Sequence, residues 1–166
     1  MGFKTVYWDA CVFHALFGAE PGRIDSCAKI EKAAASGEVR IYTSAVTFVE
    51  CAWIKTIVDG KGKMDKLSHE HEEKIQNYFM RSYIVPINCD RLIAEWARSL
   101  LWKYALHPKD AIHVASALSQ QVDVMHSYDN DILTRLNGQI GNPPLKICNP
   151  GDGDGFDPAL TQVVAL

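Results

Sequence analysis

The sequence contains five cysteines but no closely spaced pair of the CxxC type. They are scattered along the chain: Cys11, Cys27, Cys51, Cys89 and Cys148. An odd and dispersed set is typical of reduced thiols that serve mostly as small core residues in a cytosolic protein. We therefore expect a cytoplasmic location and no structural zinc site.

Long apolar runs and a strong net charge are also missing. No uncharged apolar stretch approaches the roughly 18 residues that a membrane span needs. Asp9 interrupts the early apolar run, so no signal peptide is expected. A net charge of −3 with 22% charged residues is unlike a highly basic nucleic-acid coat protein or a disordered tail. A nucleic-acid partner is not excluded, because clustered carboxylates hide the sign of the surrounding surface.

The hydrophobic content is sufficient for one domain, with 48% hydrophobic residues in a chain of 166. Short β-branched or aromatic segments predict strands at 4–8, 39–43, 82–87, 123–127 and 145–148. Amphipathic segments predict helices at 11–17, 24–35, 45–58, 68–81, 90–104 and 108–120. This alternation predicts the α/β class, with a central parallel sheet of four to five strands covered by helices on both faces. After Pro150 we expect a mobile tail.

Four carboxylates stand in otherwise apolar surroundings. In the segment VYWDACVF, Asp9 ends the first expected strand, and Asp129 closely follows the strand at 123–127. Glu50 falls within the apolar stripe of an expected helix, and Asp110 lies in the first turn of another. Sites in parallel sheets form beyond the carboxyl ends of the strands. We therefore expect these four side chains at one end of the sheet.

Each carboxylate also has a purely structural interpretation. Asp9 and Asp129 can each cap the helix that follows them, and Asp110 can favour the positive end of a helix dipole. For Asp110 and Asp129 taken singly, these explanations are sufficient. Glu50 differs, because no lysine or arginine stands at the contacting positions of its own helix. Pairing with a cation distant in sequence is the remaining structural alternative for Glu50.

Several carboxylates in one cleft repel one another unless a positive charge lies between them. Lys109, beside Asp110, is the only lysine or arginine that the sequence places next to any of the four. A hard divalent cation with oxygen ligands would resolve the repulsion, and Mg²⁺ or Mn²⁺ suits carboxylate and water ligands. The pattern therefore predicts a Mg²⁺ or Mn²⁺ site.

The blocks VYWDACVF, YTSAVTFVE, HPKDAIHVASAL and HSYDNDIL resemble, in order and spacing, those of PIN-domain nucleases, and most nearly the VapC-like toxins of bacterial and archaeal toxin–antitoxin pairs. The resemblance covers residues 4–148. It implies a PIN-like three-layer fold, with a nuclease domain at 1–148 and a C-terminal tail at 149–166.

The resemblance also assigns roles to residues. Its acidic quartet matches Asp9, Glu50, Asp110 and Asp129, which are the implied catalytic residues and metal ligands. Asp131 matches a further acidic position of some members, and Ser127 a hydroxyl position before the fourth acid. Apart from the resemblance, Thr43 or Ser44 can cap the helix expected at 45–58, which makes Ser44 a supporting residue. Cys11 stands where many relatives have asparagine or serine, and a thiol is a poor ligand for Mg²⁺.

The function implied by the resemblance is Mg²⁺- or Mn²⁺-dependent hydrolysis of RNA by the toxin of a toxin–antitoxin pair. It also implies a cognate antitoxin and a homodimer, to which the apolar residues of the helix at 90–104 could contribute unless they are wholly core. Candidates for binding the RNA backbone are Lys61, Lys63, Lys66 and Arg81. Each of these has a solvated surface role as its simpler explanation.

Two other classes of function compete with this one. An aspartate-nucleophile phosphatase usually has a second aspartate two residues after the first, where this chain has Cys11. A catalytically weak RNA-binding or protein-interaction module with a PIN fold is the stronger alternative. Retention of all four acids favours the nuclease. His113 lies on the same helical face as Asp110 and is expected to be a core histidine bonded to backbone, with a hydrogen bond near the site as the alternative.

Overall fold

The computed structural model describes residues 3–58, 61–64 and 69–155. Its main sheet has five strands in the order β5-β2-β1-β6-β7, and every neighbouring pair is parallel. The strands are β1 (Lys4–Trp8), β2 (Val39–Ser44), β5 (Ile84–Ile87), β6 (Val124–His126) and β7 (Ile147–Cys148). The predicted α/β class and parallel sheet are confirmed.

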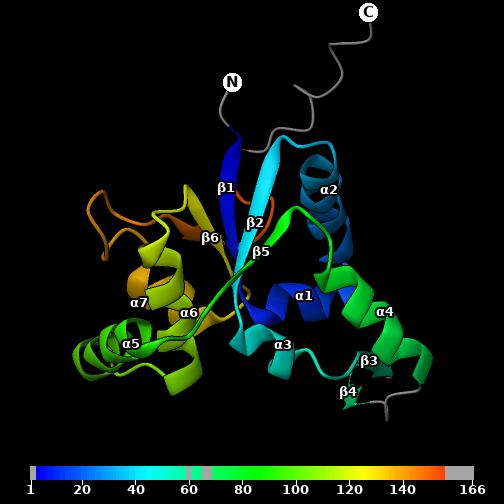
Figure 1. Ribbon diagram of the computed structural model, residues 1–166, viewed down its shortest axis with the longest axis horizontal. Coiled ribbons are helices and arrows are strands. Elements are labelled where there is room, and N and C mark those ends of the chain that lie inside the picture. Colours follow the sequence, from blue (N-terminus) through cyan, green and yellow to red (C-terminus); the bar gives the residue numbers. More distant parts are fainter. Residues whose placement is uncertain (1–2, 59–60, 65–68, 156–166) are drawn as a thin grey trace, which may run out of the picture.

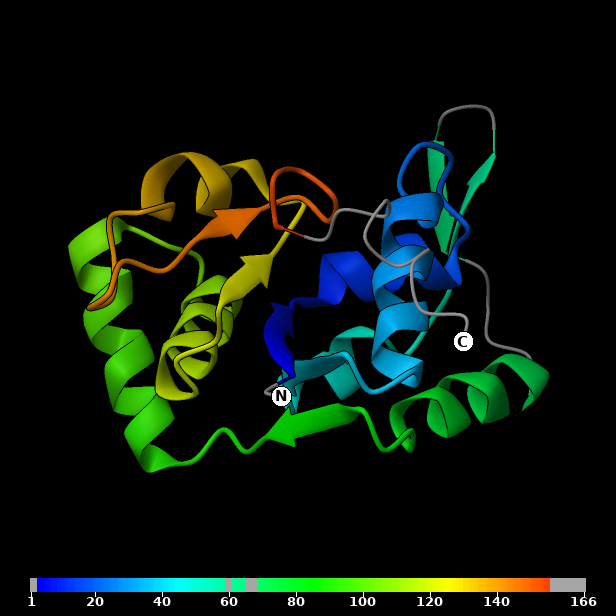
Figure 2. The same ribbon diagram turned by 90° about the horizontal axis from the view of Figure 1, so that it is seen from above.

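Helices cover both faces of this sheet (Figures 1 and 2). One layer consists of α5 (Arg91–Tyr104), α6 (Pro108–Ser119) and α7 (Asn130–Leu136), and the other of α1 (Ala10–Phe17), α2 (Ile24–Ala35) and α4 (His69–Phe79). Tyr7 and Met125 pack into the first core, whereas Val6 and Trp8 pack into the second. Successive strand residues point to opposite faces, and both faces are buried, so consecutive apolar residues such as Val6, Tyr7 and Trp8 all lie in the core. No helix in the described ranges is long and apolar enough to span a membrane.

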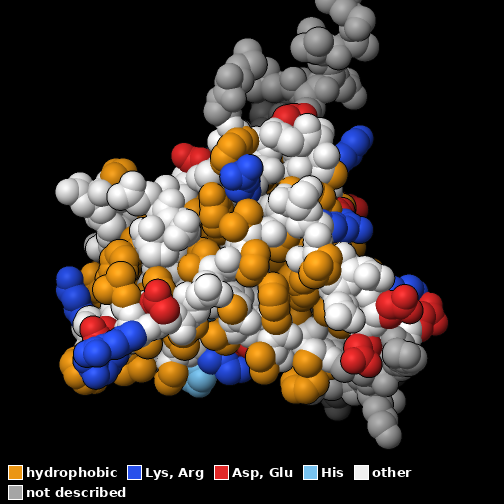
Figure 3. All heavy atoms as spheres, in the orientation of Figure 1, with side chains coloured by type: hydrophobic (Ala, Val, Ile, Leu, Met, Phe, Trp, Pro, Cys, Tyr) orange, Lys and Arg blue, Asp and Glu red, His pale blue; other side chains and the backbone are white. Residues whose placement is uncertain are grey.

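The parallel register brings the segments after the strands to one edge of the sheet. Trp8 is opposite His126, and Tyr7 is opposite Tyr42, so β1, β2 and β6 end at similar levels. In Figure 1 this carboxyl edge is the lower one, where α1 and α3 (Val46–Glu50) begin. Figure 3 shows hydrophobic side chains gathered across the middle of the face that Figure 1 presents, with charged side chains at its left and right margins.

The helix expected at 45–58 is wrong beyond Glu50. The chain instead forms β3 (Lys55–Val58), which pairs with β4 (Lys61–Met64) as an antiparallel hairpin outside the main sheet. The segment KTIV contains three β-branched residues, which favour a strand. The expected apolar stripe is therefore not a buried face, and Val49 is 74% exposed.

The expected mobile tail is, over its described part, packed against the sheet. Asp154 is only 4% exposed, and its carboxylate lies 3.2 Å from Nε2 of the buried His126. The Gly151 amide donates to the same carboxylate at 2.7 Å, and the Lys4 ammonium donates to the Asp154 carbonyl. The segment up to residue 155 therefore belongs to the packed structure.

Candidate active site

The structure brings Asp9, Glu50, Asp110 and Asp129 together around one pocket at the carboxyl edge of the sheet. They come from the end of β1, the end of α3, the first turn of α6 and the residue before α7. The pocket has a volume of about 440 Å³. Its other lining residues include Cys11, Val49, Trp53, Lys109 and His113.

Asp9 combines its capping role with its place in the pocket. Its Oδ1 accepts hydrogen bonds from the Val12 amide at 3.2 Å and from the Cys11 thiol at 2.7 Å. Burial raises the pKa of Asp9 above its ordinary value, although the charge of His113 and these hydrogen bonds act in the opposite direction. Burial and the charge of Asp9 both raise the pKa of Cys11, so the thiol stays protonated and acts as a donor.

Asp129 likewise caps a helix. The Asp129 Oδ1 accepts hydrogen bonds from the amides of Asp131 and Ile132 at 2.8 and 3.2 Å. The Asp129 amide donates to the Ser127 hydroxyl at 2.9 Å. Ser127 thus supports the backbone of Asp129. The Asp131 carboxylate instead lies 3.2 Å from Arg135 and does not line the pocket.

Asp110 lies between these two environments and is half-buried. Burial raises its pKa above the ordinary value, and the nearby charge of Asp129 raises it further. Within the described residues, no lysine, arginine or histidine forms an ion pair with Asp9, Asp110 or Asp129. None of these three aspartates is therefore paired with a protein cation among the described residues, although the charge of His113 acts on Asp9 and Asp110.

Glu50, in contrast, is neutralised by a distant segment. Its two oxygens lie 2.7 Å from Nε2 of His113 and 3.2 Å from Nζ of Lys109, both on α6. Burial acts to raise the pKa of Glu50, but its contacts with His113 and Lys109 outweigh burial and lower the pKa. Sequence analysis correctly found no partner on the same helix, but it could not find the pairing to α6.

His113 is not bonded to backbone as expected, but connects two side chains. Its Nδ1 lies 2.8 Å from the Tyr7 hydroxyl, which accepts from the Ser44 amide at 3.0 Å. Because Ser44 supplies that donor, the tyrosine can donate its proton to Nδ1, while His113 donates from Nε2 to Glu50. Ser44 thus supports the site through its amide, and its hydroxyl also accepts from the Val46 amide.

The model of the PIN domain family matches residues 6–138, most of the chain. The chain belongs to the PIN domain family. The fold is similar to VapBC2 from Rickettsia felis bound to a DNA fragment from its promoter (13% identity, TM-score 0.59, covering 87% of this chain and 98% of that one). It is also similar to VapC20 of Mycobacterium tuberculosis, a sarcin-ricin loop cleaving toxin (14% identity, TM-score 0.55, covering 76% of this chain and 91% of that one).

A toxin–antitoxin complex from Klebsiella pneumoniae has a similar fold as well (21% identity, TM-score 0.53, covering 78% of this chain and 91% of that one). At these identities the structures show a shared fold. No curated protein matches the sequence. The family match confirms the PIN-like fold that the four sequence blocks implied.

The donor chemistry of this PIN domain suits a hard divalent cation. In the described part of the chain, no three Asp, Glu, His or Cys side chains are arranged to hold a metal ion as they stand. Mg²⁺ usually binds through one or two carboxylates, keeping several waters or taking substrate phosphates. Asp110 and Asp129, which act on each other electrostatically and have no protein cation among the described residues, meet that requirement.

Among the basic residues expected to bind the RNA backbone, Arg81 is placed differently from expectation. Arg81 precedes β5 at the amino edge of the sheet, where its guanidinium pairs with Glu31 and contacts Tyr83, so it does not reach the pocket. The side chains of Lys61 and Lys63, and all of Lys66, lie outside the described residues. Lys109 does line the pocket, and its position beside Asp110 was the available signal.

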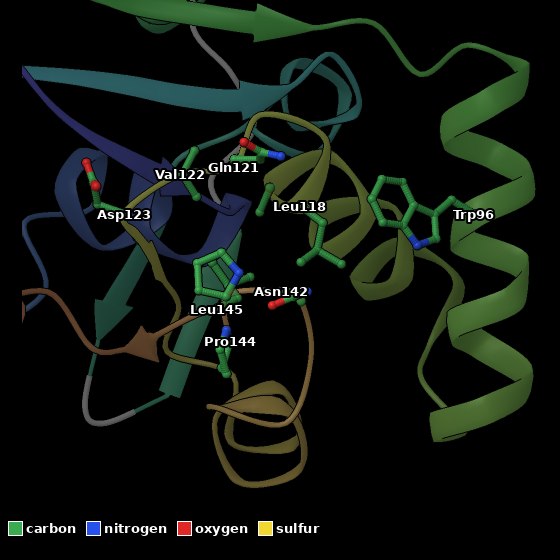
Figure 4. Close-up of a pocket in the computed structure, with 11 residues that line it drawn as sticks. Trp96, Leu118, Gln121, Val122, Asp123, Asn142, Pro144 and Leu145 are labelled. Atoms are coloured by element: carbon green, nitrogen blue, oxygen red, sulfur yellow. The ribbon is translucent and has the colours of Figure 1, made fainter.

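A second hollow, of about 310 Å³, lies at the opposite edge of the sheet (Figure 4). Trp96 of α5 and Leu118 at the end of α6 line one side of it, and Leu145 lies on the other. The carboxylate of Asp123 already accepts two hydrogen bonds from Thr5. None of the four acids lines this hollow, so the candidate chemistry stays at the carboxyl edge.

Proposed function

We propose that this PIN domain is a Mg²⁺- or Mn²⁺-dependent endoribonuclease that hydrolyses RNA phosphodiester bonds. One observation carries the proposal. Asp9, Asp110 and Asp129, which are distant in sequence, line a single pocket, and no lysine, arginine or histidine among the described residues forms an ion pair with any of them. Membership of the PIN domain family supports the nuclease class.

The residues divide the work of such a reaction. Asp110 and Asp129, assisted by Asp9, would hold the cation. When bound, the ion supplies positive charge that activates water and stabilises negative charge on the phosphate. His113 and Lys109 contact the two oxygens of Glu50 and keep it ionised before RNA binds, and the contact with His113 fixes its orientation. This geometry suits Glu50 to orient the attacking water and accept its proton.

A cleavage assay on single-stranded and structured RNA tests this proposal. We expect cleavage in Mg²⁺ or Mn²⁺, none in EDTA, and none by Asp129→Asn in either metal. Normal cleavage by a folded Asp129→Asn protein would refute the assigned chemistry. Circular dichroism spectra of both proteins provide the control for folding.

A catalytically weak PIN-fold binding module remains the second candidate. It is favoured by the pairing of Glu50 with Lys109 and His113, which leaves one member of the expected quartet without need of a metal. The two functions differ in Mn²⁺ binding measured by calorimetry. RNA binding without measurable Mn²⁺ affinity or cleavage would support the binding module.

We further propose that the chain is the cytoplasmic toxin of a toxin–antitoxin pair, as the names of its structural relatives suggest. Its expression alone should stop bacterial growth, and coexpression of a neighbouring antitoxin gene should restore it.

A homodimer is also proposed. On α5, Ile93, Ala97 and Leu100 are buried, whereas Leu92 and Trp102 are 69% and 72% exposed and leave apolar surface for a second copy. Light scattering tests that state.

A further inference from the structure

Among the described residues that line the acidic pocket, Lys109 is the one lysine or arginine. Its side chain is 56% exposed, while its ammonium lies 3.2 Å from Oε1 of Glu50. An ion pair with so much solvent access contributes little net stability, so the ammonium can change partners at small cost. An RNA phosphate entering this acidic pocket would find its protein counter-charge at Lys109.

Trp53 lines the same pocket and follows α3 directly. It is 40% exposed, and its pocket neighbour Val49 is 74% exposed, so a large ring remains accessible beside the carboxylates. Nucleic-acid bases stack on such rings in single-stranded complexes, with little dependence on sequence. The exposed ring and the cationic side chain thus provide the two kinds of contact that one nucleotide requires.

We propose that Trp53 and Lys109 form a nucleotide subsite of this pocket, in which the indole stacks on a base of single-stranded RNA and the ammonium binds a backbone phosphate. The inference rests on the proposed ribonuclease function and adds the substrate contacts of the same site. Lys109 leaves Glu50 for the phosphate when RNA binds. Glu50 keeps its hydrogen bond to His113 throughout.

The two residues should have different effects on metal binding. Removing the ammonium makes the pocket more negative, so Lys109→Met should strengthen Mn²⁺ binding while it weakens RNA binding. Removing the indole changes no charge, so Trp53→Leu should weaken RNA binding alone. A merely structural role for either residue would not produce this pattern.

The test measures binding of a fluorescein-labelled oligouridylate by anisotropy in EDTA, where metal-dependent cleavage does not occur. Trp53→Leu should raise the Kd by about tenfold, whereas Trp53→Phe, which keeps a stacking ring, should raise it less than about threefold. Lys109→Met should raise the Kd and reduce the slope of log K against log salt by about one charge. Lys109→Arg should restore most of the binding.

Matched controls lie outside the pocket. Trp96→Leu removes a tryptophan of similar exposure (38%), and Lys74→Met removes a lysine that pairs with Glu70, so neither should change the Kd. Mn²⁺ affinity and circular dichroism are measured for every variant. Oligouridylate binding that is equal in the wild type, Trp53→Leu and Lys109→Met proteins would overturn the subsite.

Two further outcomes are informative. If Trp53→Leu binds RNA normally but loses binding to a coexpressed protein, the indole belongs to a protein interface and the subsite is refuted. If the wild type shows no Mn²⁺-dependent cleavage yet binds oligouridylate through Trp53 and Lys109, the proposed function fails while the subsite is supported. The two proposals can therefore fail separately.

Discussion

The acidic pocket has an aspartate side, formed by Asp9, Asp110 and Asp129, and a glutamate side, formed by Glu50. Both sides carry carboxylates, but their surroundings shift the carboxylate pKa values in opposite directions. On the aspartate side, burial raises the pKa values of Asp9 and Asp110, and the charge of Asp129 raises the latter further. On the glutamate side, His113 and Lys109 overcome burial and lower the pKa of Glu50. Among the described residues, no ion pair stabilises the ionised aspartates, so a bound cation would have to do so. The ionised Glu50 is stabilised by Lys109 and His113 of α6.

This difference suggests a division of roles within one acidic quartet. Carboxylates without a protein cation are available to a metal ion, because binding relieves their repulsion. A carboxylate already held by an ammonium and an imidazole would lose those contacts on binding a metal. Position in the pocket therefore does not by itself give the four acids one function.

The largest expected effect is on metal affinity. Asp129→Asn should weaken Mn²⁺ binding by at least about a hundredfold, since even groups that only support a metal ligand change affinity by about 10- to 100-fold. Glu50→Gln should change Mn²⁺ affinity by less than about threefold, because Lys109 and the hydrogen bond from His113 already stabilise Glu50. Isothermal calorimetry measures both values. Equal losses in the two variants would remove the distinction between the sides.

A second effect concerns the stability of the metal-free protein, with opposite signs on the two sides. Asp110→Asn should raise the free energy of unfolding, because it removes a partly buried charge that faces Asp129. Glu50→Gln should lower it by about 1 kcal/mol, because it weakens a hydrogen bond to His113 and the pairing with Lys109. Urea unfolding in EDTA at neutral pH measures both. A lower stability of Asp110→Asn would contradict the repulsion argument.

The same two variants should change the pH dependence of stability in opposite directions. The folded pKa of Asp110 is raised, so its contribution is present below the unfolded pKa and is lost as the pH rises through the folded pKa. The folded pKa of Glu50 is lowered, so its contribution is present above the unfolded pKa and is lost as the pH falls through the folded pKa. Urea unfolding of the metal-free proteins across the acidic pH range measures both contributions. The pH dependence that Asp110 contributes should be absent in Asp110→Asn, and that of Glu50 should be absent in Glu50→Gln.

The smallest effect is expected at Asp131, which resembles a further acidic position of the family but pairs with Arg135 outside the pocket. Asp131→Asn should leave Mn²⁺ affinity unchanged and alter the free energy of unfolding by less than about 0.5 kcal/mol, as is usual for an exposed ion pair. Calorimetry and urea unfolding measure the two quantities. A clear loss of Mn²⁺ affinity would extend the aspartate side to Asp131.

Sequence reasoning succeeded where short-range patterns carry the information. Asp9 and Asp129 follow buried parallel strands, so the edge at which they lie is set by strand direction alone. It failed at 45–58, where an apolar spacing of helical period crosses into the β-branched segment KTIV and no strong breaker marks the change. It also missed the packing of Asp154, since nothing near Asp154 in the sequence points to His126.

By itself, the sequence determined the alternation of strands and helices, the parallel sheet, and the end of it at which the acids gather, because these depend on local periodicity and chain direction. Only the tertiary structure decided which acid has a protein partner. Lys109 and His113 lie on α6 and reach Glu50 on α3, while burial and the charge of Asp129 raise the pKa of the neighbouring Asp110. Such pairings depend on distances of a few ångströms between segments far apart in the chain, and charge interactions change steeply over that range.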